Sequence, residues 1–368
     1  MASSRSPLVL FQVPNRIGLG HMNRMACIAL ALRDLKPEIR VLFVVEGAAH
    51  GLLESFDLPY VAVPFPGVVY QTEAWRAWSQ FDRWRMMSAM TSSILVTSRP
   101  DLVVFDCFPS MHFIQIVPCL GIKSMLCIRK VKNFEEYASD PAVRRSLETA
   151  ASLLIPHWEE EFSIPDSLRS RATYVGPIVK AIPATIESPQ KRFNLTKKRV
   201  IVICAGGGGG EEAVDFFNMC VGAFSLVKNE VQDLAALLVT GPLFRRWSKL
   251  ELASDVRVTP FDSRFSSTCA AADLVISQAG YNSINELAST GTPTICIPVE
   301  RVYDDQIERA HRMAAEYSNI DCFEGRGVED LADLIKVRLK AGATYPRGIF
   351  PDGAYRAAMH VIDQLDPG

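Results

Sequence analysis

Short apolar runs alternate with helical patterns through the first half of the chain. The apolar runs are continuous instead of alternating with polar residues, which is typical of strands buried on both faces. They lie at Ser6–Val13, Val41–Val45, Tyr60–Val63, Leu102–Phe105 and Ser124–Ile128. Helical patterns stand between them, notably over 22–33 and 80–98. This order predicts a parallel sheet with crossover helices.

The same alternation restarts after a polar stretch. Residues 156–199 are rich in proline, serine and charge and show no helical or strand period, so we place a hinge near Gly176–Pro189. Helices are expected to begin near Glu211, Ser283 and Asp304. The later strands are expected at Arg199–Cys204, Ala235–Thr240, Val256–Thr259, Leu274–Ser277 and Pro293–Pro298.

The two halves together predict an α/β protein with two doubly wound, Rossmann-like domains facing across a cleft. We expect an N-terminal domain over residues 1–178, a second domain over 179–350, and a terminal helix within 351–368. Sheets of this kind bind ligands at the carboxyl ends of their strands. The loops directly after the strands are therefore the places to look for chemistry.

Composition narrows the function classes. The chain has 368 residues, of which 48% are hydrophobic and 22% charged, and a net charge of −2, which is ordinary for a globular protein and does not favour nucleic-acid binding. No apolar run approaches the ~20 residues of a membrane span, so we expect a cytoplasmic protein, with peripheral membrane contact left open. The nine cysteines form no C-x-x-C pair and no D-x-D motif lies at a suitable loop, so no metal is expected.

The first glycine loop follows the first predicted strand. In the segment GLGHMNR, Gly18 and Gly20 allow a ligand to approach the backbone closely, and the helix that follows offers free N–H groups to an anion. His21 stands beside them with a pKa range suited to proton transfer. Asp106 ends another strand and is a candidate to orient the His21 imidazole, and Arg129, after the next strand, is a candidate phosphate ligand or a solvated surface residue.

A second glycine loop follows the first strand of the second half, in the equivalent place. The sequence AGGGGGEE contains Gly206, Gly207 and Gly208, which we interpret as a phosphate or substrate loop in preference to a linker. A linker does not normally stand between a strand rich in β-branched residues and a helix.

The strongest signal is the block over residues 272–313. There a strand is followed by a turn with Gly280, Asn282 or Ser283 is expected to cap a helix, and Glu286 lies one turn inside that helix. Asp305 and Gln306 open the next predicted helix. A capped helix N-terminus suits a pyrophosphate, a carboxylate suits ribose hydroxyls, and an acid beside an amide suits sugar hydroxyls.

This block resembles the donor-binding motif of the GT-B glycosyltransferases, most closely the MurG-like family 28 enzymes, and GLGH resembles their first glycine loop. The resemblance implies a nucleotide-sugar donor, with UDP as carrier, and a small-molecule acceptor. It also implies that the terminal helix returns to the N-terminal domain. The implied roles are ribose binding by Glu286, sugar binding by Asp305 and Gln306, diphosphate binding by Ser283 and the backbone around Gly280, and contact with the base by the backbone at Phe261 and Asp262.

The chain also departs from the MurG pattern. The second glycine loop lacks the further polar residues of that family and continues directly into Glu211, and the loop between Pro298 and Gln306 differs. A lipid-linked muramyl pentapeptide is therefore not the acceptor that we expect.

The leading hypothesis is an inverting glycosyltransferase that needs no metal or other cofactor and uses His21 as general base. The diphosphate would be received by the helix near Ser283, with Arg129 or Arg264 in support. GLGHMNR also resembles the UDP-sugar hydrolase of pseudaminic acid synthesis, and a sugar 2-epimerase shares the two-domain fold. A nucleotide-sugar-binding partner subunit is the alternative that is not an enzyme.

An aromatic segment over residues 64–87 holds Trp75, Trp78 and Trp84 beside several arginines. Three interpretations remain open for it. It provides an aromatic platform for an acceptor, it touches a lipid surface, or it packs on its own sheet.

Overall fold

The computed structural model describes residues 5–15, 18–47, 50–63, 77–180, 182, 186–197, 199–341 and 352–365. Backbone contacts divide the chain into two compact units. The first unit comprises Met1–Arg16, His21–Val179 and Pro351–Gly368, and the second comprises Ile17–Gly20 and Lys180–Phe350. The division after Val179 falls one residue beyond the boundary drawn from the sequence.

The first unit is built on a parallel sheet with the strand order β3-β2-β1-β4-β5-β6-β7. Its strands are β1 (Leu8–Asn15), β2 (Arg40–Gly47), β3 (Tyr60–Val63), β4 (Leu102–Asp106), β5 (Lys123–Cys127), β6 (Ser152–Ile155) and β7 (Ala172–Tyr174). Its helices are α1 (Gly20–Leu35), α2 (Gly51–Ser55), α4 (Gln80–Ser98), α5 (Met111–Ile116), α6 (Phe134–Ser139), α7 (Pro141–Thr149), α8 (Asp166–Arg169) and α15 (Gly353–Leu365). A short 3₁₀ turn covers Pro118–Leu120.

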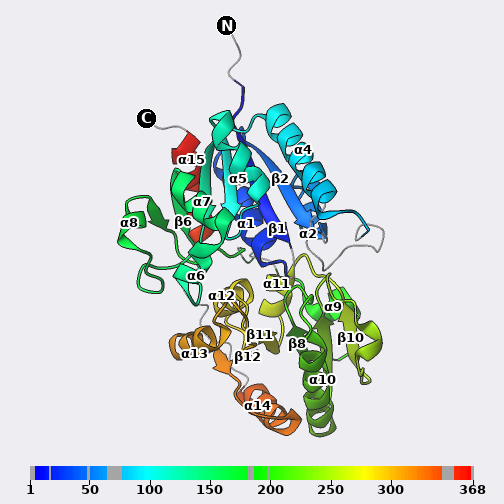
Figure 1. The fold of residues 1–368 in the computed structure, drawn as a ribbon. Helices are drawn as coiled ribbons and strands as arrows, with labels where there is room; N and C mark the ends of the chain where they lie inside the picture. Colours follow the sequence, from blue (N-terminus) through cyan, green and yellow to red (C-terminus); the bar gives the residue numbers. More distant parts are fainter. Residues whose placement is uncertain are drawn as a thin grey trace. The chain divides into compact units, whose positions relative to one another are not determined.

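The second unit repeats this architecture with the strand order β10-β9-β8-β11-β12-β13, again parallel (Figure 1). Its strands are β8 (Arg199–Cys204), β9 (Leu234–Val239), β10 (Val256–Thr259), β11 (Leu274–Gln278), β12 (Thr294–Ile297) and β13 (Ile320–Cys322). Its helices are α9 (Pro189–Phe193), α10 (Ala213–Glu230), α11 (Phe265–Ala270), α12 (Tyr281–Thr290), α13 (Gln306–Glu316) and α14 (Val328–Ala341). A 3₁₀ turn covers Trp247–Lys249.

The continuous apolar runs are explained by burial on both faces of each sheet. In β8, Ile201 and Ile203 pack into a core with α10 and α14, whereas Val200 and Val202 pack into a separate core that includes Leu287 of α12. Successive side chains of a strand point to opposite faces, so a strand covered by helices on both sides must be apolar at every position. The doubly wound α/β class predicted from the sequence is confirmed.

The polar stretch was partly misread. The sequence analysis gave residues 156–199 no period, yet β7 lies within them and is the edge strand of the first sheet, next to β6. Three residues are too few to show a strand period, and as an edge strand β7 is half-buried along its length. Tertiary pairing therefore decides this element.

The C-terminal helix α15 groups with the first unit, beside β5 and β6 (red in Figure 1). Lys123 donates from Nζ to the Gln364 carbonyl at 3.0 Å, and the Ser152 hydroxyl lies 2.5 Å from His360 Nε2. Val361 is fully buried. Thus the chain leaves the first unit after Val179 and supplies it again with its last helix.

None of the helices in the described ranges is long and apolar enough to cross a membrane. The tryptophan segment is seen only in part, because Trp75 lies outside the described residues. Trp78, which precedes α4, is 49% exposed, and Trp84, in α4, is 45% exposed, so these two do not form the packed core that was one of the three interpretations.

Candidate active site

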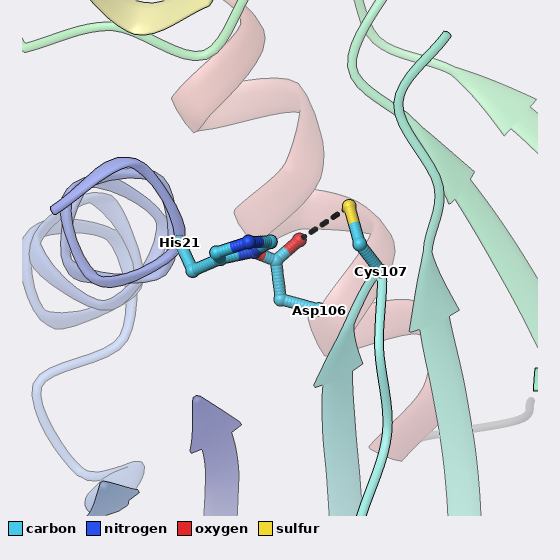
Figure 2. Close-up of side chains that lie close together, drawn as sticks. All are labelled: His21, Asp106 and Cys107. Atoms are coloured by element: carbon cyan, nitrogen blue, oxygen red, sulfur yellow. Dashed lines mark hydrogen bonds and ion pairs between the residues drawn. The ribbon is translucent and has the colours of Figure 1, made fainter. Parts of the chain in front are cut away.

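The first cluster of polar residues stands where β1 and β4 end. These strands are parallel neighbours, so the start of α1, which follows β1, meets the last residue of β4. His21 Nδ1 lies 3.0 Å from Asp106 Oδ2 (Figure 2). The imidazole is 24% exposed and the carboxylate fully buried, so one ring edge remains accessible. The structure therefore brings together the two residues that the sequence analysis could only suggest as a pair.

Arg24 is a member of this cluster that the sequence analysis missed. Its Nη2 donates to both Asp106 oxygens, at 2.9 and 2.8 Å, and its Nε donates to Oδ1 at 3.2 Å. Arg24 is 2% exposed. The signal was present, because a residue three positions after His21 lies on the same face of a helix. Its partner, however, is 82 residues away in the chain.

These contacts determine the charge states of the cluster. Burial alone would raise the pKa of Asp106, but the Arg24 guanidinium and His21 lower it to about 2. Burial also lowers the pKa of His21 below 6.5, Asp106 opposes this shift, and Arg24 and Arg129 add to it. At neutral pH the cluster therefore contains an ionised carboxylate and a neutral imidazole.

Cys107 is the third potential metal ligand in this cluster. The ligand atoms of His21, Asp106 and Cys107 lie within 4.8 Å of one another, a grouping that sequence spacing did not reveal (Figure 2). Burial, followed by the Asp106 charge, raises the pKa of the Cys107 thiol to about 11. With a protonated thiol and a carboxylate already held by the Arg24 guanidinium, this donor set does not suit a cation.

Arg129 follows β5 and is half-buried near the pair. The next residue, Lys130, donates its backbone N–H to His157 Nε2 at 2.9 Å, and His157 Nδ1 lies 2.9 Å from Glu161 Oε2. Because Nε2 accepts a backbone hydrogen bond, Nδ1 carries the proton and donates it to Glu161. His157 thus anchors the segment that carries Arg129. The sequence analysis did not single out this histidine.

The second cluster of candidates lies at the carboxyl end of the second sheet. Glu286 is in α12, is 6% exposed, and accepts a hydrogen bond from the Ser266 hydroxyl at 3.0 Å. At the end of β11, Gln278 is 6% exposed and its Nε2 has no hydrogen-bond partner in the structure. Buried polar atoms normally have partners, so this donor is a feature that ligand binding would explain. Gln278 was not among the residues chosen from the sequence.

The expected helix cap was wrong. Neither Asn282 nor Ser283 caps α12, because Gly280 occupies the cap position in an extended conformation and the helix already begins at Tyr281. The Asn282 side chain instead donates to the Gly20 carbonyl at 2.6 Å, a contact within the second unit. A Cβ built at Gly280 would meet nothing within 4 Å, so the N-terminus of α12 is sterically open.

Asp305 and Gln306 begin α13, as predicted, and both use side-chain oxygens locally. Asp305 Oδ1 accepts from the Glu308 N–H at 3.0 Å and caps the helix, while Gln306 Oε1 accepts from the Val299 N–H at 3.2 Å. These two hydrogen bonds do not involve Asp305 Oδ2 or Gln306 Nε2. The two residues therefore have a structural function in addition to any contact with a sugar.

The second glycine loop is held by backbone packing. Gly206 and Gly208 have φ values of +61° and +73°, and a Cβ at Gly208 would stand 2.0 Å from the Thr240 carbonyl oxygen. A Cβ at Gly207 would stand 2.5 Å from Cα of Gly18, which belongs to the same unit. Gly206 alone of these three has open space at its Cβ position. Packing thus requires glycine at Gly207 and Gly208, whereas Gly206 is open to a ligand.

The turn at Phe261 and Asp262 has a structural carboxylate. Asp262 is 7% exposed and accepts from Arg192, from the Thr268 hydroxyl and from the Arg264 N–H, at 2.5, 2.5 and 2.8 Å. The Arg264 guanidinium lies 3.3 Å from Glu187. Arg264, one of the two arginines suggested for the diphosphate, is therefore already paired with a carboxylate.

Comparison with known proteins now gives these sites a context. Residues 202–340 match the glycosyltransferase family 28 C-terminal domain. Over 119 residues the chain is 31% identical to a UDP-N-acetylglucosamine–N-acetylmuramyl-(pentapeptide) pyrophosphoryl-undecaprenol N-acetylglucosamine transferase of Prochlorococcus marinus, an alignment that covers 29% of this chain and 32% of the relative. The match thus spans about a third of that relative's length.

Solved structures show the fold over nearly the whole chain. A putative UDP-N-acetylglucosamine 2-epimerase from Listeria monocytogenes superposes with a TM-score of 0.64 at 15% identity, covering 99% of this chain and 97% of that one. MurG of Acinetobacter baumannii superposes with a TM-score of 0.56 at 14% identity, covering 98% and 100%. At these identities the likeness establishes the fold alone. The chain therefore has the GT-B fold, and residues 202–340 of its second unit are similar to the glycosyltransferase family 28 C-terminal domain.

Proposed function

We propose that this protein is an inverting glycosyltransferase that moves a sugar from a nucleotide donor, UDP-linked as first choice, to an acceptor hydroxyl without a metal or other cofactor. The match of residues 202–340 to the family 28 C-terminal domain carries this proposal. In it, the second unit binds the donor, with Glu286 at the ribose, the N-terminus of α12 at the diphosphate, and Asp305 and Gln306 at the sugar. The transferase of Prochlorococcus marinus supports a nucleotide-sugar substrate.

The geometry of the first unit supports His21 as the base. A neutral imidazole that donates Nδ1–H to Asp106 presents the lone pair of Nε2, and Nε2 is the atom that accepts the proton of the acceptor hydroxyl. As that proton leaves, the acceptor oxygen bonds to the anomeric carbon and the bond from this carbon to the diphosphate oxygen breaks. Asp106 then stabilises the imidazolium, while Arg24 keeps Asp106 ionised and in place.

A hydrolase is the second candidate, and Arg24 is the observation that favours it. The histidine and arginine of GLGHMNR, the motif that resembles a UDP-sugar hydrolase, both contact Asp106. In this candidate water replaces the acceptor hydroxyl. Incubation with UDP-sugars alone separates the two, because a hydrolase releases free sugar quantitatively, a transferase does so only slowly, and an epimerase returns an isomeric UDP-sugar.

The first experiment is a thermal-shift panel with UDP, GDP, TDP and ADP and their sugars, since a ligand that binds the folded state raises Tm. We expect the UDP compounds to stabilise the protein most.

The His21→Ala variant should keep this shift but lose about 10²–10⁴-fold in kcat, the usual contribution of a general base. Unchanged turnover of that variant would exclude His21 as the general base. That result would be expected if the protein were a nucleotide-sugar-binding subunit. Absence of any nucleotide shift would overturn the proposal.

A further inference from the structure

An ion pair joins the two loops at which this chain departs from the MurG pattern. Arg301 lies in the loop after β12 and donates from Nη2 to Glu212 Oε1. Glu212 follows the five glycines of the second glycine loop and Glu211. In the sheet, β11 stands between β8 and β12, and all three strands are parallel. The loops after β8 and β12 therefore leave the sheet at the same edge as the Gln278–Gly280 turn. This turn begins with Gln278, the last residue of β11, and ends with Gly280, directly before α12.

The Gln278–Gly280 turn has the features of a binding site for an anion. Gln278 is 94% buried, and its Nε2 donor has no partner. Gly280 leaves its Cβ position open at the N-terminus of α12, where backbone N–H groups and the helix dipole favour negative charge. The orphan amide and the open helix end are independent observations, and they stand in the same three residues.

Two acidic residues beside the second glycine loop are each paired with an arginine. Two acids, Glu211 and Glu212, follow the five glycines, and their charge would repel a diphosphate. Each faces an arginine, because Glu211 lies 3.5 Å from Arg246 and Glu212 contacts Arg301. A Cβ at Gly210 would stand 2.1 Å from Glu212 Oε1, so the Glu212 carboxylate lies folded against the loop itself.

The Glu212–Arg301 pair can be exchanged at low cost. Its side chains are 33% and 30% exposed, and ion pairs of such exposure contribute about 0–1 kcal/mol. A guanidinium bound to a phosphate group forms stronger, charge-assisted and often bidentate hydrogen bonds. A nucleoside diphosphate that reaches the N-terminus of α12 would therefore compete well with Glu212 for Arg301.

We propose that Arg301 is a donor-binding residue that neutralises the diphosphate, and that Glu212 holds it at the same edge of the sheet as the Gln278–Gly280 turn until the donor arrives. The inference rests on the proposed function, because it requires a nucleoside diphosphate at α12. During transfer the same guanidinium stabilises the charge that develops on the leaving diphosphate. Donor binding thus breaks the Glu212–Arg301 pair and forms an arginine–diphosphate pair in its place.

The test measures UDP and uridine affinities of the full-length chain by calorimetry for Arg301→Gln, Glu212→Gln and the double variant. Arg301→Gln should weaken UDP binding roughly tenfold to hundredfold, the range for losing a hydrogen bond to a charged group, and leave uridine binding unchanged. Glu212→Gln removes the competitor and should tighten UDP binding. The double variant should resemble Arg301→Gln.

Arg246→Gln is the matched control, because Arg246 also pairs with an acid of this loop and also donates to the Gly210 carbonyl, at 3.2 Å. It should change UDP affinity by less than about threefold, since a charge that does not touch the ligand is screened by solvent. If Arg301→Gln binds UDP like the wild type, or if Glu212→Gln weakens UDP as much as Arg301→Gln does, the pair is structural and the inference fails. The proposed function survives that result. If the wild type binds no nucleoside diphosphate, both fail.

Discussion

At the scale of single residues, the pKa of His21 is determined by its burial and by three charged neighbours. Burial, Arg24 and Arg129 lower the pKa of His21, and Asp106 raises it. The lowered pKa leaves the ring neutral at physiological pH, which a general base requires. The acidic limb of the pH profile of kcat/KM should therefore lie below pH 6.5.

Replacing Arg24 tests this balance. In Arg24→Gln the positive charge beside His21 is lost, so the pKa of His21 rises and the acidic limb of kcat/KM moves to higher pH. Initial rates measured between pH 5 and pH 9 would show the shift. A merely structural arginine would lower the rate at every pH without moving the limb, and that result would contradict the assignment.

Arg24 also bears on acid stability. The pKa of Asp106 is about 2 in the folded protein against 3.8 for a free side chain, so its ionised form contributes about 2 kcal/mol to the free energy of unfolding above pH 4. This contribution is lost as the pH falls from about 4 to 2. Urea unfolding across this range should show a smaller loss for the Asp106→Asn variant. An equal loss in variant and wild type would place the acid sensitivity elsewhere.

At the scale of elements, two glycines that look alike in sequence should respond differently to substitution. Gly208→Ala places a Cβ 2.0 Å from a backbone oxygen at a φ of +73°, so it should lower the free energy of unfolding by more than about 1 kcal/mol. Gly280→Ala has open space and an ordinary φ of −62°, so it should cost no more than about 0.5 kcal/mol.

Urea unfolding of both variants measures the difference in stability. Titration of Gly280→Ala with UDP tests whether Gly280 lets the diphosphate approach the backbone. If the diphosphate approaches the backbone there, Gly280→Ala weakens UDP binding while the fold stays intact. Full UDP affinity in this variant would place the diphosphate elsewhere.

At the scale of the whole molecule, the last helix returns to the unit that the chain left after Val179. Its buried face is part of the first unit, so Val361→Ala should destabilise that unit by roughly 1–3 kcal/mol. Met359 is 57% exposed on the same helix, and Met359→Ala should change stability by less than about 0.5 kcal/mol. Differential scanning calorimetry checks both. Equal effects of the two substitutions would show that α15 does not stabilise the first unit.

Much of this molecule follows from sequence alone. The continuous apolar runs determine strands covered on both faces, and their alternation with helices determines the doubly wound class, because both depend on local periodicity. Glycines after strand ends mark loops, and Asp305 and Gln306 mark the start of α13, because these signals are also local in the chain. The short strand β7 escaped because three half-buried residues carry no period.

The tertiary structure decided the rest, since those features depend on residues far apart in the chain. Arg24 meets Asp106 because β1 and β4 are neighbours, and Glu212 meets Arg301 because β8 and β12 flank β11. Gly280 is the N-cap residue of α12, whereas the Asn282 side chain donates to the Gly20 carbonyl. Sequence thus determined which side chains follow the strands, whereas strand order determined which of them touch, because hydrogen bonds and ion pairs form only over a few ångströms of space.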